Sequence, residues 1–319
     1  MRLSCLAVAL ATLLASASAH AYCRSTTCSG DCERNADGCK ISGEPLSWPS
    51  LCVGFSMQRD GTEWIPMGDI LPIVHAAFAE WSARDCGGGG QSTIAFVELD
   101  MVDCHEAEHN EDDPNANIIM FQDSRWIYTD DDNTLAKTTV TYDTETGEIF
   151  DADIEINHAN NGFTLTDPPG ECSSSNDCYD LQSVLTHEIG HFIGLDHTEA
   201  STATMNMGYT RATTELRSLE PDDIDAVCAA YPPGREATCD TEPQNGFGNE
   251  CASDGCGCSM ARRDWGWPML AGLLVLLRYG ASRQAARSGR QRSSRQARQL
   301  AFMPAHSSAQ RAGRHSKTS

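Results

Sequence analysis

Apolar and polar positions follow patterns that change along the chain. Between Asp69 and Ser82 the apolar residues return every three to four positions, so we expect an amphipathic helix that begins with Asp69 as its N-cap. Runs of apolar and β-branched residues follow and predict strands, and a turn at Gly147 joins the last two. The predicted strands cover residues 92–99, 115–122, 134–143 and 148–157.

Two further helices are predicted after the strands. The first runs from Leu181 to Phe192, with Asp180 as its N-cap and Gly194 as the residue that ends it. The second covers residues 220–231 and is closed by two prolines. A helix, several strands and two more helices in this order indicate an α+β fold, in which helices back a twisted mixed sheet.

The two ends of the chain differ from this patterned part. Residues 1–21 combine Arg2, an apolar run and an Ala-His-Ala sequence, which is typical of a secretory signal peptide, so we expect an exported protein. The predicted division is 1–21 signal peptide, 22–44 cysteine-rich N-terminal cap, 45–234 main domain, 235–255 linker, 256–281 terminal tag and 282–319 basic disordered tail.

Cysteine is frequent, with 15 residues in a chain of 319. Twelve of these lie between Cys23 and Cys251, and an even number in an exported chain predicts disulfide bonds. A zinc knuckle formed by the four cysteines of residues 23–39 is the alternative. Their spacings lack the paired C-x-x-C pattern that such a site uses.

Charge is distributed unevenly along the chain. Residues 23–251 hold ten Lys and Arg against 43 Asp and Glu, which leaves a net charge of −33. Residues 262–319 hold twelve basic residues and one acidic residue. A body this acidic repels nucleic acid and anionic lipid, so we expect no nucleic-acid partner.

The segment HEIGHFIGLDH predicts a metal site. On a helix, His187 and His191 are four residues apart, so both imidazoles project from one face. Gly194 lets the chain turn, after which His197 can supply a third nitrogen. Three neutral imidazoles and a water form a catalytic zinc shell, in which zinc lowers the pKa of the water toward about 7. Glu188 is directed away from the first histidine and can accept the proton of that water.

These residues match H-E-x-x-H-x-x-G-x-x-H, the signature of the metzincin metallopeptidases. Within that group, residues 45–233 most resemble the matrixins, because AFAEWS resembles their first helix and LEPDDIDAVCAAYPP their last. The resemblance implies a matrixin-like catalytic domain with an active-site helix and one catalytic zinc. It also implies an endopeptidase that hydrolyses extracellular proteins or peptides, with Glu188 as general base and then acid.

The resemblance also implies a methionine turn after the histidines. Met205 lies eight residues after His197, the usual matrixin interval, and Met207 is the alternative. Tyr209 stands where matrixins have the tyrosine of the primed-side pocket wall. An astacin-type arrangement would pair Met207 with Tyr209, but Thr198 then stands where glutamate is expected.

The segment TLAKT resembles the cleft-edge strand of matrixins. Leu135 and Ala136 are therefore expected to bind an extended substrate, which would pair with residues 134–140 through backbone hydrogen bonds. Matrixins hold a structural zinc with one histidine in this strand and one in the next. Lys137 and Glu155 stand at those places, so we expect no second zinc.

Two acidic runs bear on calcium binding. Residues 130–132 and 151–153 offer carboxylate oxygens, which are the ligands that calcium prefers. A solvated loop or strand end is the alternative explanation, so calcium is an option and not a requirement.

The C-terminal region predicts a processing signal. Cys256 and Cys258 precede a short apolar run at residues 265–281 and a cluster of arginines. This order resembles the myxobacterial C-terminal sorting tag (MYXO-CTERM). It implies membrane contact before processing, a sorting protease that acts near one of the two cysteines, and display at the cell surface or outer membrane, or release. A helix in the core of the main domain is the alternative.

Two classes of function follow from these patterns. The first is a secreted or surface-anchored zinc endopeptidase. The second is a non-catalytic cell-surface binding or adhesion protein on the same scaffold. Glu188 argues against the second, because a structural zinc needs no base and usually has four protein ligands.

Overall fold

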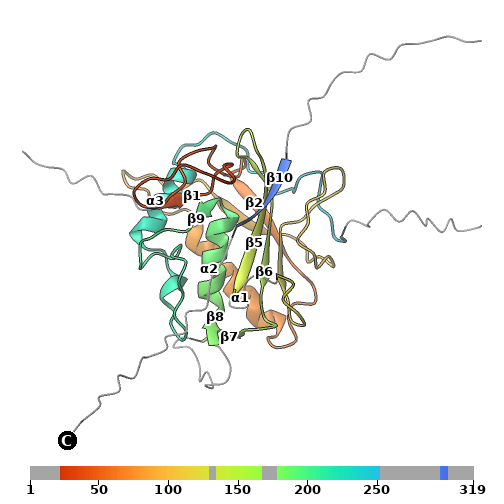
Figure 1. The fold of residues 1–319 in the computed structure, drawn as a ribbon. Coiled ribbons are helices and arrows are strands. Elements are labelled where there is room, and N and C mark those ends of the chain that lie inside the picture. The colour runs from red at the N-terminus through yellow and green to blue at the C-terminus, as the bar shows by residue number, and fades with distance from the viewer. Residues whose placement is uncertain (1–21, 129–133, 167–177, 252–294, 301–319) are drawn as a thin grey trace, which may run out of the picture.

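A mixed sheet forms the centre of the molecule (Figure 1). The structure is a computed structural model that describes residues 22–128, 134–166, 178–251 and 295–300. In the sheet the strand order is β10-β5-β6-β4-β2-β3. The strands are β2 (Cys52–Met57), β3 (Ala95–Glu98), β4 (Ile118–Phe121), β5 (Ala136–Asp143), β6 (Ile149–Ile156) and β10 (Arg295–Leu300).

Strand direction changes at one side of this sheet. Strands β3, β2, β4 and β6 run parallel to one another, whereas β5 is antiparallel to β6 and β10 is antiparallel to β5. The turn between β5 and β6 contains Gly147 at φ +75°, and a Cβ there would lie 2.5 Å from the Pro45 carbonyl oxygen. Only glycine adopts this conformation at that distance without strain.

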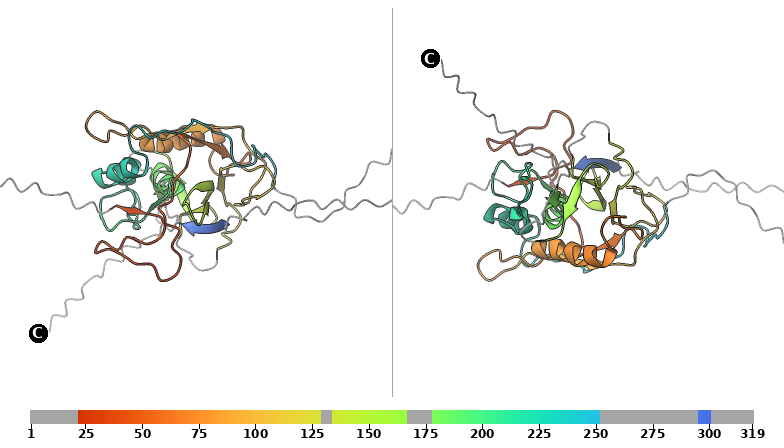
Figure 2. Two further views of the ribbon diagram at one scale, coloured as in Figure 1. Left: turned by 90° about the horizontal axis from the view of Figure 1, so that it is seen from above. Right: turned by 90° about the horizontal axis from the view of Figure 1, so that it is seen from below.

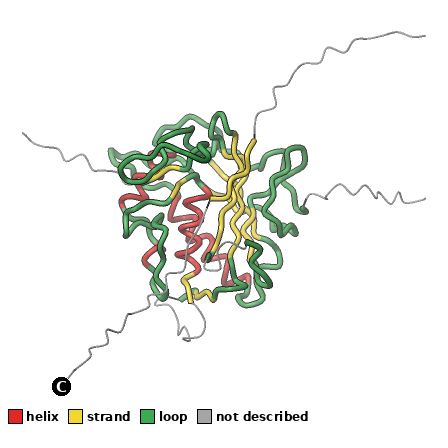
Figure 3. Tube along the Cα trace, viewed as in Figure 1, coloured by secondary structure: helices red, strands yellow, loops and turns green. Residues whose placement is uncertain are grey.

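The helices and two short strand pairs complete the fold. Figure 3 shows that loops surround these regular elements. The remaining elements are α1 (Met67–Trp81), α2 (Leu181–Phe192), η1 (Glu215–Arg217), α3 (Pro221–Ala230), the pair β1 (Cys23–Arg24) with β9 (Leu195–Asp196), and the pair β7 (Gly162–Thr164) with β8 (Cys178–Asp180). Helices together with a mixed sheet agree with the predicted α+β class.

Helix α1 joins the sheet to α2. Its predicted apolar stripe is confirmed, because the helix buries the side chains that form it: Ile70, Val74, Ala77, Phe78 and Trp81. Phe78 stacks on Phe55 of β2, and the Trp81 indole N–H donates to the Thr186 carbonyl of α2 at 2.8 Å. End-on views place α1 and β10 on opposite sides of the molecule, with α2 between them (Figure 2).

The predicted start of α1 is wrong by three residues. The helix begins at Met67 with Pro66 as its N-cap, and Asp69 lies within the first turn. The reason is that the backbone N–H groups of Asp69 and Ile70 already donate to the Pro66 carbonyl. By contrast, Asp180 is the N-cap of α2 as predicted, and its carboxylate accepts the Ser183 N–H at 2.8 Å.

Disulfide bonds staple both ends of the described body. The N-terminal cap contains Cys23–Cys39 and Cys28–Cys32, so the zinc-knuckle alternative is wrong. Three long-range bonds link distant segments, and Cys178 is also disulfide-bonded. The long-range bonds are Cys52–Cys239, Cys86–Cys228 and Cys104–Cys251.

The predicted linker and tail need correction. Residues 235–251 are attached to the body by two of these disulfides, and the Arg235 guanidinium donates to the carbonyls of Trp48 and Ser50, so this part is not a free linker. Residues 295–300 of the predicted disordered tail form β10, because the outer edge of β5 offers unpaired backbone groups.

Several predicted segments lie outside the described residues. These are the signal peptide 1–21, the acidic run 130–132, and the tag with Cys256, Cys258 and residues 265–281. Within the described residues, no helix has the length and apolar character needed to cross a membrane.

Candidate metal centre

Helix α2 and the turn after it bring three histidines together. His187 and His191 project from α2 and are buried. Gly194 then adopts φ +87°, and a Cβ there would lie 2.5 Å from the Leu46 carbonyl oxygen. This turn leads into β9, and His197 follows it. One helix and one glycine turn therefore deliver all three side chains.

The three Nε2 atoms form a nearly equilateral triangle. The distances are 3.1 Å between His187 and His197, and 3.2 Å from His191 to each of the other two. Nitrogens that each bind a tetrahedral zinc at about 2.0–2.1 Å lie about 3.3 Å apart. The spacing therefore fits a single zinc ion.

Hydrogen bonds at the opposite ring nitrogens fix the orientation of two of these rings. His187 Nδ1 lies 2.7 Å from the Thr204 carbonyl oxygen, and His191 Nδ1 lies 2.9 Å from the Leu195 carbonyl oxygen. A carbonyl can only accept, so each Nδ1 carries the proton and each Nε2 directs its lone pair toward the centre. Converging lone pairs without a donor between them are suited to a cation.

The histidines remain neutral in this environment. Burial lowers the pKa of all three, most clearly for His187, where His191 and His197 add to the effect. For His197, burial and then repulsion by His191 lower the pKa to about 3. Neutral imidazoles are the form that binds zinc.

Glu188 lies beside this triangle and is fully buried. Its Oε2 accepts a hydrogen bond from the Thr138 hydroxyl of β5 at 2.6 Å. Its Oε1 has no hydrogen-bond partner among the residues that the structure describes. Burial raises the pKa of Glu188 to about 8, and the Thr138 hydroxyl opposes that rise. One carboxylate oxygen is thus held in place while the other remains available to a ligand.

Met205 and Met207 occupy different environments. Met205 is 2% exposed and lies against Gly190, the helix residue between His187 and His191. Met207 is 49% exposed. The Met205 and Thr204 backbone N–H groups donate to the Asp223 carboxylate at 3.0 and 2.8 Å. These placements favour Met205 for the floor of the centre.

Tyr209 is also buried, at 2% exposure. Its hydroxyl donates to the Thr213 carbonyl at 2.6 Å and accepts the Asp180 N–H at 3.1 Å. The side chain therefore connects the methionine turn to the start of α2. At this exposure it offers little surface to the predicted pocket.

The predicted substrate strand differs in detail from the expectation. The side chains of Leu135 and Ala136 are fully buried, so only their backbone can meet a substrate. The Leu135 carbonyl accepts the Asn157 N–H at 2.9 Å and so faces the sheet. Because consecutive residues of a strand direct their polar groups to opposite edges, the backbone groups of Ala136 and Thr138 face outward.

Lys137 and Glu155 face each other across β5 and β6. The Lys137 ammonium lies 3.1 Å from the centroid of the Tyr128 ring, and Glu155 accepts hydrogen bonds from Tyr128 and from Gln122. Burial lowers the pKa of Lys137 to about 8, while the charge of Glu155 acts in the opposite direction. The absence of a second zinc at Lys137 and Glu155 stays a prediction.

Of the two acidic runs considered for calcium, only residues 151–153 lie among the described residues. Asp151 and Asp153 are fully buried, and burial raises the pKa of both well above its usual value. Neither belongs to a group of three converging metal donors within the described residues, and calcium is not shown.

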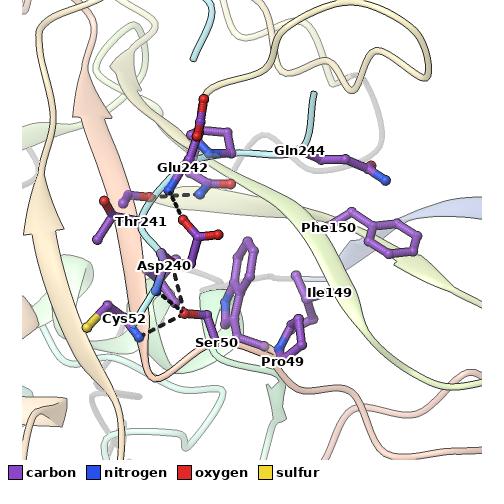
Figure 4. Close-up of a pocket in the computed structure, with 14 residues that line it drawn as sticks. Pro49, Ser50, Cys52, Ile149, Phe150, Asp240, Thr241, Glu242 and Gln244 are labelled. Carbon is purple, nitrogen blue, oxygen red and sulfur yellow. Dashed lines mark hydrogen bonds between the residues drawn. The ribbon is translucent and has the colours of Figure 1, made fainter. Parts of the chain in front are cut away.

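A cavity of about 190 Å³ lies elsewhere on the molecule. Figure 4 shows Ser50 and Cys52 beside Asp240, with hydrogen bonds at the Ser50 hydroxyl, and Ile149 and Phe150 on the other side of the cavity. None of the three histidines lines this cavity, so it is separate from the metal centre.

The chain belongs to the matrixin family. The family model "Matrixin" matches residues 48–232, which is more than half of the chain and includes the complete histidine motif. Matrixins are zinc-dependent metallopeptidases, so the protein is a metallopeptidase hydrolase. No curated protein sequence matches the chain.

Three contributors to the centre were not singled out from the sequence. Thr138 acts on Glu188 from β5, Gly190 makes room for Met205, and Lys40 pairs with Asp196 at 2.8 Å. For Gly190 the signal was its position between two histidines that share a helix face. For Thr138 and Lys40 the sequence held no such signal, because their partners Glu188 and Asp196 are distant in sequence.

Proposed function

We propose that the protein is an exported zinc endopeptidase that cleaves extended segments of extracellular proteins or peptides. The observation that carries this proposal is the triangle of three neutral Nε2 atoms beside the buried Glu188 carboxylate. Zinc bound there would polarise the scissile carbonyl and lower the pKa of a water molecule to near neutrality.

The chain's own residues would then move the proton. A zinc cation bound at the histidines would lower the pKa of Glu188 from the value of about 8 that burial produces, and so favour its carboxylate form. Glu188 Oε1 would then accept a proton from the attacking water, while Thr138 keeps Oε2 in place. The same carboxyl group can release that proton to the departing amine, which completes the hydrolysis. Met205 supports the helix beneath the histidines, and we retain Tyr209 as a residue near the primed side.

The substrate would add as a strand to the outer edge of β5. The backbone pairing of β10 with Thr138–Asp143 supports this proposal, because it demonstrates that the edge accepts an antiparallel segment. Ala136, with its backbone groups directed outward, would extend this pairing toward Glu188. The buried side chain of Leu135 would contribute only by supporting the strand.

The proposed location is outside the cytoplasm, at the cell surface or in the medium. Support comes from the signal-like residues 1–21 and from the disulfides, which persist in oxidising compartments. We also propose that residues 256–281 act as a sorting tag. The adhesion alternative is not favoured, because the family match is to a peptidase and Glu188 is present.

The Glu188→Ala protein tests the proposal. It should retain zinc, because no ligand is removed, and should lose cleavage of casein or gelatin by at least about a hundredfold. Zinc content and proteolysis are measured on the same preparation, with a chelator-treated wild type as the reference. Proteolysis at the wild-type rate in the zinc-loaded variant would exclude the proposed role of Glu188.

A further inference from the structure

We propose that residues 22–46, the N-terminal clamp, are part of the metal centre, and that Lys40 is a positioning residue for His197. By fixing the turn that presents His197, the clamp would set how tightly the metal is held. This inference rests on the proposed function, because it takes the three histidines to be metal ligands.

The clamp is attached to the metal-binding turn along its backbone. Strand β1 pairs with β9, with Cys23 opposite Asp196 and Arg24 opposite Leu195. The Ser25 N–H donates to the Gly194 carbonyl at 2.9 Å, one residue before β9 begins. Each residue of the turn from Gly194 to Asp196 therefore has a backbone or strand partner in the clamp.

The clamp also shares a hydrogen-bond acceptor with a metal-binding histidine. The Leu195 carbonyl accepts from the Ser25 hydroxyl at 3.0 Å and from His191 Nδ1 at 2.9 Å. Both contacts are buried. The carbonyl that orients the His191 ring is thus held by the N-terminal segment.

An ion pair between Lys40 and Asp196 connects the clamp to the backbone of His197. Lys40 Nζ lies 2.8 Å from Asp196 Oδ2, and the two side chains are only 11% and 19% exposed. The other carboxylate oxygen, Asp196 Oδ1, accepts the backbone N–H of His197 at 3.0 Å. The carboxylate therefore bridges the ammonium group of the clamp and the backbone of the third histidine.

A disulfide bond couples these two attachments. Cys23 lies in β1, opposite Asp196, and Cys39 precedes Lys40. Their covalent bond ties the strand contact to the ion pair, so neither attachment can move far without the other. The Cys28–Cys32 bond closes a short loop within the same segment, with a sequence separation of 4.

The consequence follows from how His197 is supported. His187 and His191 are fixed by α2, whereas His197 follows a two-residue strand after a glycine turn. A ligand on such a turn binds well only if the turn is held in place by its surroundings. Groups that orient metal ligands typically change metal affinity by about 10–100-fold when they are removed.

The experiment measures zinc dissociation constants by chelator competition for the wild type, Lys40→Met and Lys40→Arg. Lys40→Met should bind zinc at least about tenfold more weakly. Lys40→Arg should recover most of the affinity, because the charge is retained. The matched control is Arg59→Met, which breaks the exposed Arg59–Asp103 pair, and it should bind zinc as the wild type does.

A second comparison tests the disulfide. The Cys23→Ala/Cys39→Ala protein should lose zinc affinity in the same direction as Lys40→Met, and the Cys28→Ala/Cys32→Ala protein should lose much less. Melting temperatures of the zinc-free proteins are recorded, because a purely structural role would lower these and leave the zinc constant unchanged.

The possible results separate the two proposals. Wild-type zinc affinity in Lys40→Met, with or without a lower melting temperature, would overturn the role of Lys40. Equal losses in the two double-cysteine proteins would overturn the role of the Cys23–Cys39 bond. Failure of the wild-type protein to bind zinc would contradict the proposed function itself, and with it the inference on Lys40 that rests on that function.

Discussion

At the scale of single residues, Gly190 and Met205 illustrate how tightly the centre is packed. Gly190 lies in α2 between His187 and His191, and a Cβ there would approach Trp81 Cζ2 to 3.0 Å and Met205 Sδ more closely still. The sequence places a glycine between two histidines without revealing what fills the space. Met205, fifteen residues later, occupies it.

Gly190→Ala is therefore expected to destabilise the protein. An added methyl group must displace Met205 or Trp81, which typically costs about 1–3 kcal/mol in a packed core and outweighs the gain in helix propensity. Denaturant unfolding measures the change in the free energy of unfolding.

Gly68→Ala is the matched control for this prediction. Gly68 is an exposed glycine of α1, and a Cβ there would meet nothing within 4 Å. Its replacement should be neutral or stabilising by up to about 1 kcal/mol. Equal stability of Gly190→Ala and wild type would contradict the packing argument.

At the scale of elements, β5 lies between helix α2 and the outer edge of the sheet. Its Thr138 contacts Glu188 on one side, and its backbone pairs with β10 on the other. The hydrophobic pattern predicted β5 and β6 within two residues at each end. It could not predict β10, since an Arg- and Gln-rich segment forms a strand here only because a partner edge is available.

Removing residues 252–319 should increase activity on peptides. The shortened protein would leave the outer edge of β5 open, whereas in the full chain β10 pairs with this edge and would compete with the proposed substrate strand. We expect a lower KM and a similar kcat, measured with one fluorogenic peptide on both proteins. An unchanged KM would show that β10 does not compete with substrate.

At the scale of the whole molecule, covalent bonds join segments that are far apart in sequence. Cys52–Cys239, Cys86–Cys228 and Cys104–Cys251 span 187, 142 and 147 residues. These bonds close long loops, which constrains the unfolded chain strongly in the loop-entropy account. An acidic body with self-repelling charges gains from such constraints.

The Cys52→Ala/Cys239→Ala protein should be less stable by about 2–5 kcal/mol, because its unfolded state is less constrained and residues 235–251 lose one of their two attachments. Thermal unfolding in the presence of zinc provides the measurement. The Cys28→Ala/Cys32→Ala protein should lose less, since that bond closes a loop of separation four. Similar losses in both would contradict the argument from loop length.

The sequence by itself determined the extent of α2 and its N-cap Asp180, the buried stripe of α1, and the three histidines of the metal centre. These features depend on local periodicity and short spacings. Only the tertiary structure decided which cysteines pair, that Met205 and not Met207 lies under the helix, and that Lys40 and Thr138 support the centre. The contacts of Thr138 with Glu188, Lys40 with Asp196 and Cys52 with Cys239 join residues 50, 156 and 187 positions apart, and no local pattern encodes a partner at that distance.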